Sequence, residues 1–524
     1  MSMNALPFVS RSLALLGLFV GATGATAPDN AVTPAQTVSV PERGALSLSV
    51  EEAVALVLEH NPELASERRN PIVAGTFEAV ERARFDPTLF ANVTRSRALT
   101  QQQFDNTNET LEIESDRESY AVGARQVLPT GTELELSLSQ QLSESNRSPT
   151  QADAELGLTV TQALLRGAGM RTNLVALRQA RSDVAASAYQ LRGFASALVA
   201  EVERLYWDYV GARERIRILE ASLDLAEREA QATATRIEVG ALPRTELAAV
   251  RAEAARRRQD LIDGRAEARR LQSELLARLS PPGQPVWERT VDATSAPELE
   301  TDPVPDVAAH VALARARRAE LNEARMQLVT NELEVVATRN GLLPRLDLFI
   351  TLGQTGFSDS FGEAWSNVEE RENYNLSAAL EFEYPFGNRA ARARDVRAGA
   401  QRLQAEESLR NLDQLVQSEV RNAVLEVERS AAQIEATAAT LALQEQALEA
   451  EQARFEVGRS TALLVAQVQR DLLQAQLDRA QAFIAYRQAL IDLYRLDGTL
   501  LTRRLIEAPG AEPPAGYDLP TVSG

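Results

Sequence analysis

The sequence lacks several residue types on which enzymes and metal sites depend. Its 524 residues include no cysteine, no lysine and only two histidines, His60 and His310. Without cysteine there are no disulfides, thiolate metal sites or cysteine nucleophiles, and without lysine there is no P-loop or Schiff-base chemistry. We therefore expect no catalytic residues, no cofactor and no metal, and we interpret the abundant Asp and Glu as a solvated surface.

Aromatic side chains and positive charge are also scarce. Aromatic residues make up 5% of the chain, and most of its apolar content is Ala, Leu and Val, a composition typical of long helices. The 74 acidic and 55 basic side chains leave a net charge of −19. This balance predicts that nucleic acid is not a partner.

The amino terminus has the order of an export signal. Arg11 precedes an apolar run over 13–20, and small residues follow over 21–27, which is typical of a secretory signal peptide. A membrane anchor is the alternative, but a spanning helix needs about 20 apolar residues. No other segment approaches that length, so contact of the mature chain with a membrane would require strands or a surface helix.

The rest of the chain is a tandem duplication. The segment Arg236-Ile237-Glu238-Val239-Gly240 recurs 218 positions later as Arg454-Phe455-Glu456-Val457-Gly458. Upstream, Asn61-Pro62-Glu63-Leu64 and Pro87 align with residues 257 positions later. The first copy therefore carries 39 additional residues between its proline and its long helix.

Each copy predicts a helix, strands, a long helix, a turn and a shorter helix. Helical spacing covers about 49–84 and 307–339, and each stretch is followed by period-two alternation, clearest at Leu134, Leu136 and Leu138. Polar segments at 100–117, 143–153 and 355–371 are interpreted as loops. An extra hairpin over 120–142 either adds two strands to the sheet or decorates its rim, and the sequence leaves both open.

The long helices, about 172–238 and 389–456, would each measure about 100 Å. The returning helices, 245–279 and 462–496, reach half that length. Alanine and leucine at seven-residue spacing predict close lateral packing. We expect the half-length helix of the other copy to cover the far half of each rod, with the linker and the tail as a belt around the middle.

Amphipathic strands in an exported chain fit a membrane barrel, with one face toward lipid and the other toward water. A soluble sheet has the same periodicity. Two observations favour the membrane barrel over the soluble sheet. The polar face of the predicted strands is too rich in charged residues to be buried, and the helices offer no compact layer that could cover the apolar face. Four to six strands per chain are fewer than the eight of the smallest barrels, so closure requires several chains.

The sequence resembles the TolC family of outer-membrane efflux proteins. The resemblance rests on the stretch from Leu48 to Leu64, on Gln162 to Gly167, on Glu201 to Tyr209 and on both Val-Gly turns. It implies a mainly α fold with a membrane β part: a homotrimeric β-barrel in outer-membrane lipid, continued by a periplasmic α-helical barrel. It also implies passive conduction, with a periplasmic adaptor (membrane fusion) protein and an inner-membrane RND or ABC transporter as partners.

The resemblance places the two Val-Gly turns at the periplasmic tips, where the adaptor docks. The corresponding residues are Arg236, Val239, Gly240, Thr245 and Glu246 in the first copy and Arg454, Val457 and Gly458 in the second. A plain helix break would need the same glycines.

The gate departs from the family prototype. Leu464 and Gln467 stand at the two positions of the pair that makes an acidic ring in the prototype. Phe455 and Ser460 replace the tyrosine and arginine that hold its tip shut. The candidate gate therefore comprises Phe455, Leu463, Leu464 and Gln467, closed by apolar packing and dewetting. The sequence does not identify the cargo. A periplasmic coiled-coil scaffold without a pore is the alternative, but it leaves the strands unexplained.

The predicted segments are a signal peptide (1–27), an N-terminal extension (28–48), a first-copy helix (49–86), first-copy membrane strands with the extra hairpin (87–163), a first-copy long helical hairpin (164–280), an equatorial linker (281–306), a second-copy helix (307–343), second-copy membrane strands (344–386), a second-copy long helical hairpin (387–497) and a C-terminal equatorial tail (498–524).

Overall fold

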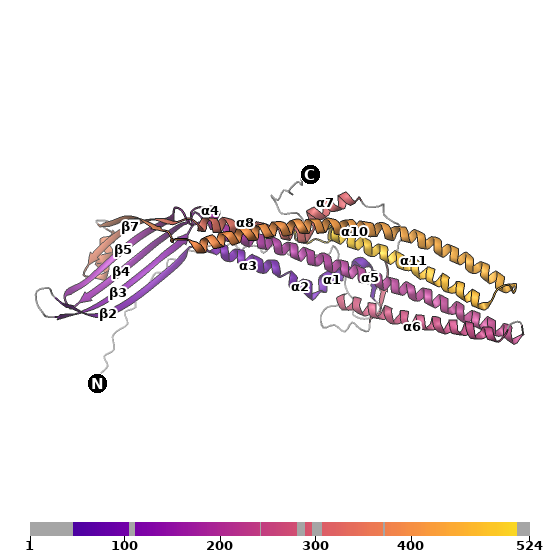
Figure 1. Cartoon of the computed structure of the whole chain (residues 1–524). Coiled ribbons are helices and arrows are strands. Elements are labelled where there is room, and N and C mark those ends of the chain that lie inside the picture. Colours follow the sequence, from indigo (N-terminus) through magenta and orange to yellow (C-terminus); the bar gives the residue numbers. More distant parts are fainter. Residues whose placement is uncertain are drawn as a thin grey trace, which may run out of the picture.

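The chain folds into an elongated molecule with a sheet at one end and long helices running away from it (Figure 1). This computed structural model describes residues 46–103, 110–240, 243–279, 289–295, 306–369 and 373–510. The predicted export signal lies outside the described residues, as do most of the predicted linker and half of the predicted tail. Among the described residues, no helix is both long and apolar enough to cross a membrane.

The two copies share one general order of a short strand, helices, sheet strands, a long helix and a shorter helix, but the first copy has two more sheet strands and the second has the additional helix α9 between its sheet strands. The first copy comprises β1 (Leu46–Leu48), α1 (Val50–His60), α2 (Pro62–Glu67), α3 (Asn70–Ala83), β2 (Thr88–Gln103), β3 (Thr110–Val127), β4 (Thr132–Ser145), β5 (Ser148–Ala163), α4 (Met170–Asn173), α5 (Val175–Glu238) and α6 (Thr245–Leu279). The second comprises β6 (Val291–Ala293), α7 (Val307–Arg317), α8 (Ala319–Gly341), β7 (Arg345–Ser358), α9 (Phe361–Glu369), β8 (Tyr374–Glu383), α10 (Arg389–Glu456), α11 (Ala462–Leu496) and α12 (Leu500–Arg503).

The first helical stretch of each copy is interrupted, where the sequence predicted one helix. A capping box starts α1: the Ser49 hydroxyl accepts from the Glu52 amide, and the Glu52 carboxylate accepts from the Ser49 amide. The helix ends at Asn61, because Pro62 disfavours a helical residue before it, and the Asn61 side chain then caps α2. The second copy breaks at Arg318, the equivalent position.

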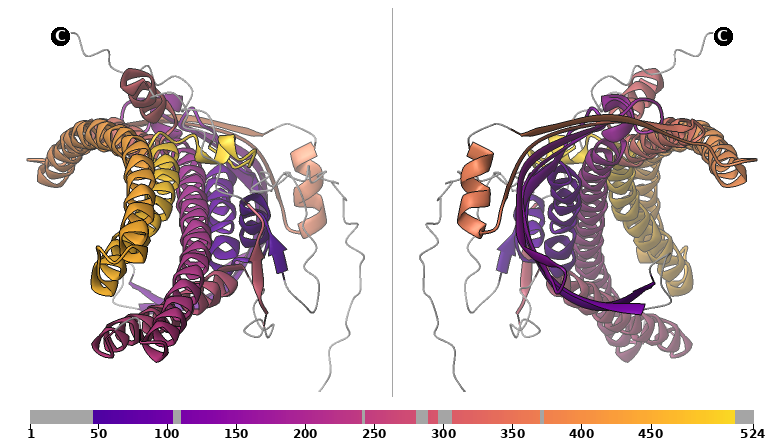
Figure 2. Two further views of the ribbon diagram at one scale, coloured as in Figure 1. Left: turned by 90° about the vertical axis from the view of Figure 1, so that its right-hand side faces the viewer. Right: turned by 90° about the vertical axis from the view of Figure 1, so that its left-hand side faces the viewer.

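All six long strands form one antiparallel sheet in the order β2-β3-β4-β5-β7-β8. The extra hairpin of the first copy, β3–β4, lies inside this sheet and is paired on both sides. It therefore adds two strands to the sheet rather than decorating a rim. Figure 2 shows the sheet as a curved arc with α9 on its convex side.

All three segments that were predicted to be loops contain strand or helix residues. β2 and β3 pair as far as Gln103 and Thr110, and β4 and β5 pair as far as Ser145 and Ser148. The backbone ladder continues there although these segments lack a regular alternation of apolar and polar side chains. On β2 and β3, polar side chains contact one another across the strands instead. The polar segment 355–371 contains the end of β7 and the helix α9.

Helix α9 packs against the convex face of the sheet. Ala364 and Val368 of α9 form a buried cluster with Ala152 and Ala154 of β5. Gly356 of β7 permits this approach, because a Cβ atom there would lie 2.0 Å from the Ala364 carbonyl oxygen. Helix α9 therefore covers part of the convex face.

The long helices α5 and α10 contain 64 and 68 residues, or about 96 and 102 Å. Nearest the sheet, the neighbouring helices run in the order α3, α5, α8, α10; farther away the order is α6, α5, α11, α10. The half of each rod nearest the sheet is thus covered by α3 and α8, rather than by the returning helix of the other copy as the sequence suggested. Four helices lie side by side in each half.

The largest apolar core lies midway along the rods. Tyr206 of α5 is fully buried there, and its hydroxyl donates to the Leu48 carbonyl oxygen at 2.8 Å. Tyr209 donates to the Val291 carbonyl oxygen at 2.6 Å. These contacts hold the parallel pair β1–β6 against the helices. Leu500 and Leu501 of α12 bury their side chains in the same core.

Candidate functional site

The concave face of the sheet is polar and mainly acidic. Strand pairing places on it seven acidic and three basic side chains: Glu133, Glu135, Asp153, Glu155, Asp347, Glu381, Glu383, Arg117, Arg125 and Arg345. Arg125 contacts Glu135 at 2.6 Å and Glu133 at 3.3 Å. Arg345 contacts Asp347 at 2.5 Å. The acidic residues outnumber the arginines, so this face has a net negative charge.

The convex face carries an apolar band. Its side chains share the face on which α9 packs, and many are highly exposed in the single chain. They are Leu89, Ala91, Val93, Tyr120, Val122, Ala124, Leu134, Leu136, Leu138, Leu156, Leu158, Val160, Leu346, Leu348, Ile350, Leu352, Leu376, Ala378, Leu380 and Phe382. A broad apolar face opposite a charged one is the pattern of a barrel strand between lipid and water.

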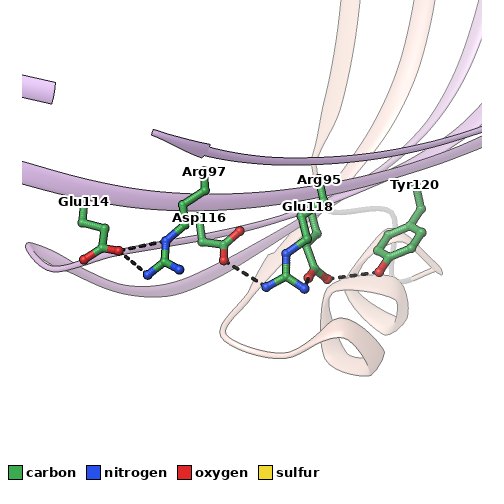
Figure 3. A network of polar contacts seen from close by, with 6 residues as sticks. All are labelled: Arg95, Arg97, Glu114, Asp116, Glu118 and Tyr120. Carbon is green, nitrogen blue, oxygen red and sulfur yellow. Dashed lines mark hydrogen bonds and ion pairs between the residues drawn. The ribbon is translucent and has the colours of Figure 1, made fainter. Parts of the chain in front are cut away.

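An ion-pair network borders this band on β2 and β3 (Figure 3). Arg95 contacts Asp116 and Glu118, both at 3.0 Å. Arg97 pairs with Glu114, and the Tyr120 hydroxyl donates to Glu118 at 3.1 Å. Since these pairs lie on the convex face beyond Val93, they mark the end of the apolar band on the side away from the helices.

Both Val-Gly turns lie at the tips farthest from the sheet, and each ends its helix with a glycine in the left-handed backbone conformation. Gly240 has φ = 77° and Gly458 has φ = 70°, a region that favours glycine. At the second tip the Gly458 amide donates to the Phe455 carbonyl oxygen and the Arg459 amide to that of Arg454, which is a Schellman motif. A Cβ atom on either glycine would meet no atom within 4 Å, so both turns are open on the outside.

The remaining predicted tip residues surround these turns. Val239 and Val457, the C-caps, are 74% and 70% exposed. Thr245 and Glu246 begin α6. Leu463, Leu464 and Gln467 lie in the first turns of α11, whose N-cap Thr461 accepts from the Leu464 amide. Leu463 and Leu464 are 58% and 46% exposed in the single chain.

One contact joins the two tips, and two others lie within the second tip. The Arg236 guanidinium lies 5.4 Å from the centre of the Phe455 ring, a cation–π contact between the two hairpins. Ser460 donates to Glu451 within the second hairpin. This hydrogen bond lowers the pKa of Glu451. Arg454 contacts Glu451 at 3.1 Å.

A buried polar cluster between α6 and α11 was missed by the sequence reasoning. Glu253 of α6 is 6% exposed and contacts Arg257 at 2.7 Å and Arg470 of α11 at 3.1 Å. Close by, Gln469 of α11 donates to Glu229 of α5, whose pKa burial raises. We name these five residues the hairpin clasp. The sequence pattern did not single them out, since the Glu253–Arg470 and Glu229–Gln469 contacts each join residues more than 200 positions apart.

Comparisons with known proteins agree with this architecture. The family model described as outer membrane efflux protein matches residues 110–279 and 311–499, more than half of the chain. The pyoverdine export outer membrane protein OpmQ of Pseudomonas aeruginosa is 27% identical over 338 residues, which cover 62% of this chain and 66% of OpmQ. The match thus spans slightly less than two thirds of that relative.

Solved structures show the same fold. The Campylobacter jejuni CmeC outer membrane channel is 15% identical and matches with a TM-score of 0.61 over 86% of each chain. The outer-membrane channel OprN is 18% identical, with a TM-score of 0.63 over 91% of this chain and 98% of its own. The chain belongs to the outer membrane efflux protein family, so it is an outer-membrane protein that extends into the periplasm and not an enzyme.

Proposed function

We propose that this protein is the outer-membrane exit duct of a tripartite export system. Three copies combine their sheets into one barrel and their helices into a periplasmic tunnel. Substrates pass passively, in efflux or in type I secretion. An inner-membrane RND or ABC transporter supplies the energy through a periplasmic adaptor protein. The observation that carries the proposal is a single sheet, apolar on one face and charged on the other, at the end of helices about 100 Å long.

A periplasmic scaffold without a pore is the second candidate. It accounts for the long helices, but it gives no reason for a band of exposed apolar side chains on a curved sheet. OpmQ is named for pyoverdine export, which makes export of such compounds the first activity to assay for this chain.

The open tips are the proposed docking surface for the adaptor. Val239 and Val457 expose apolar side chains beside glycines with free space around them, so a partner helix can approach the backbone closely. We expect Val457→Asp to weaken binding of the cognate adaptor at least about tenfold, a loss of roughly 1.4 kcal/mol. Surface plasmon resonance on the purified oligomer measures this. Unchanged affinity in a variant of normal oligomeric mass would refute docking at this tip.

The proposed gate is apolar. Leu463 and Leu464 begin α11 beside the second tip, where three copies would bring them to one axis and exclude water. We expect Leu464→Ser to raise the resting conductance of the channel roughly tenfold, because a hydroxyl wets the constriction. Planar-bilayer recording measures the change, and Gln474→Ala, an exposed polar residue farther along the same helix, is the control. An unaltered conductance in Leu464→Ser would show that these leucines do not form the gate.

The acidic concave face predicts a preference for cations, since a narrow lumen with net negative charge raises the local cation concentration. Reversal potentials in a KCl gradient should show cation preference in the wild type. The double variant Glu155→Gln/Glu381→Gln should lower the cation-to-anion permeability ratio about twofold. Glu144→Gln, on the convex face, should leave the ratio unchanged. Anion preference in the wild type would contradict the assignment of the concave face to the lumen.

A further inference from the structure

The sheet of one chain is as wide as its layer of helices. Neighbouring strands lie 4.7–4.9 Å apart, and at a barrel tilt of about 40° each takes up about 6 Å of the circumference. The six strands of this chain therefore span about 36 Å. Four helices at 8–10 Å spacing span about 32–40 Å. Four strands, the number without the extra hairpin, would span only about 24 Å.

The two outer edges of the sheet need a partner. β2 and β8 are the terminal strands, and within the described part of the chain neither pairs with another strand along its outer edge. Unpaired backbone groups are costly in lipid, so a membrane sheet must close. Because six strands alternate in direction, β8 of one copy meets β2 of the next in antiparallel orientation, like every other pair in the sheet.

We infer that three copies close a barrel of eighteen strands, three times the six of one chain, through β8 of each copy and β2 of the next. Its circumference matches that of the helical tunnel, so the duct keeps its width as it enters the membrane. Barrels of about 16–18 strands leave an open aqueous channel. The extra hairpin β3–β4 thereby sets the width of the exit, and cargo size is limited at the tips. The inference rests on the three-copy assembly of the proposed function.

Disulfide cross-linking tests the junction, and the natural absence of cysteine gives a clean background. Ala378→Cys on β8 is combined in turn with Leu89→Cys, Ala91→Cys or Val93→Cys on β2. A disulfide forms only between Cα atoms about 4.4–6.8 Å apart. We expect at least one combination to yield covalent trimers under oxidising conditions. The matched control, Ala378→Cys with Tyr120→Cys, should yield none, because Tyr120 lies one strand farther in.

The cross-linked sample is then imaged by electron cryomicroscopy, which counts the strands directly. Eighteen strands and covalent trimers support the inference. Covalent dimers with twelve strands, or four strands per chain in the wall, would overturn it. Bilayer conductance of the same sample distinguishes the eighteen-stranded barrel from the exit-duct function. An eighteen-stranded trimer without conductance would support the barrel and contradict the duct function.

Discussion

Replacing Glu253 with alanine is expected to shift the resting channel strongly toward an open state. In the hairpin clasp Glu253 joins α6 to α11, and its removal leaves Arg257, which is 5% exposed, without that carboxylate. Breaking a buried ion pair on one side costs about 3–5 kcal/mol. If about 3 kcal/mol of this favours the closed arrangement, the open-to-closed ratio rises roughly a hundredfold. Single-channel recording measures this ratio.

The control for the clasp is an exposed pair on the same hairpin. Glu227 pairs with Arg258, and both side chains are about half exposed. Such pairs contribute about 0–1 kcal/mol, so Glu227→Ala should alter channel opening little. Equal effects of Glu227→Ala and Glu253→Ala, or an unchanged open probability in Glu253→Ala, would show that the clasp does not hold the tips closed.

Replacing Arg504 with alanine is expected to destabilise the middle of the molecule. Arg504 follows α12 and binds Glu203 of α5 through two hydrogen bonds of 2.6 and 2.7 Å. Glu203 is completely buried, so the variant would leave its carboxylate buried without this partner. We expect a loss of about 3–5 kcal/mol in the stability of this region, measured as faster hydrogen exchange in α5 and faster proteolysis after α12.

A second variant separates the charge from the packing. In Glu203→Met/Arg504→Met the buried charges are gone and much of the volume remains, so most of the lost stability should return. Asp292→Ala removes an exposed pair with Arg213 in the same region and should have a small effect. Normal protection of α5 in Arg504→Ala would mean that this ion pair does not fasten the tail.

The sequence was informative wherever the pattern is local. The Val-Gly repeat predicts both tips, because a left-handed glycine after a long apolar-periodic stretch ends a helix. Alternation at Leu134, Leu136 and Leu138 predicts a strand with one apolar face. Helix α9 was missed although Phe361, Ala364, Trp365 and Val368 have helical spacing, because the stretch is short and its surroundings are polar.

What the sequence could not provide is the pairing of distant segments. Whether the hairpin β3–β4 joins the wall depends on its ladder with β2 and β5, and strand neighbours are not encoded in the periodicity of either strand. The contacts of the hairpin clasp likewise join segments that are distant in the sequence. Glu253 and Arg470 look like ordinary surface charges on their own helices, and only the packing of α6 on α11 buries one against the other.

Single-channel recording of the purified protein in planar bilayers, with its oligomeric mass measured on the same sample, tests the exit duct most directly. A passive trimeric duct should give discrete, long-lived conductance steps from a particle of three chains, without any added energy source. A water-soluble protein that neither inserts nor conducts would contradict it, and the long helices would then be those of a periplasmic scaffold.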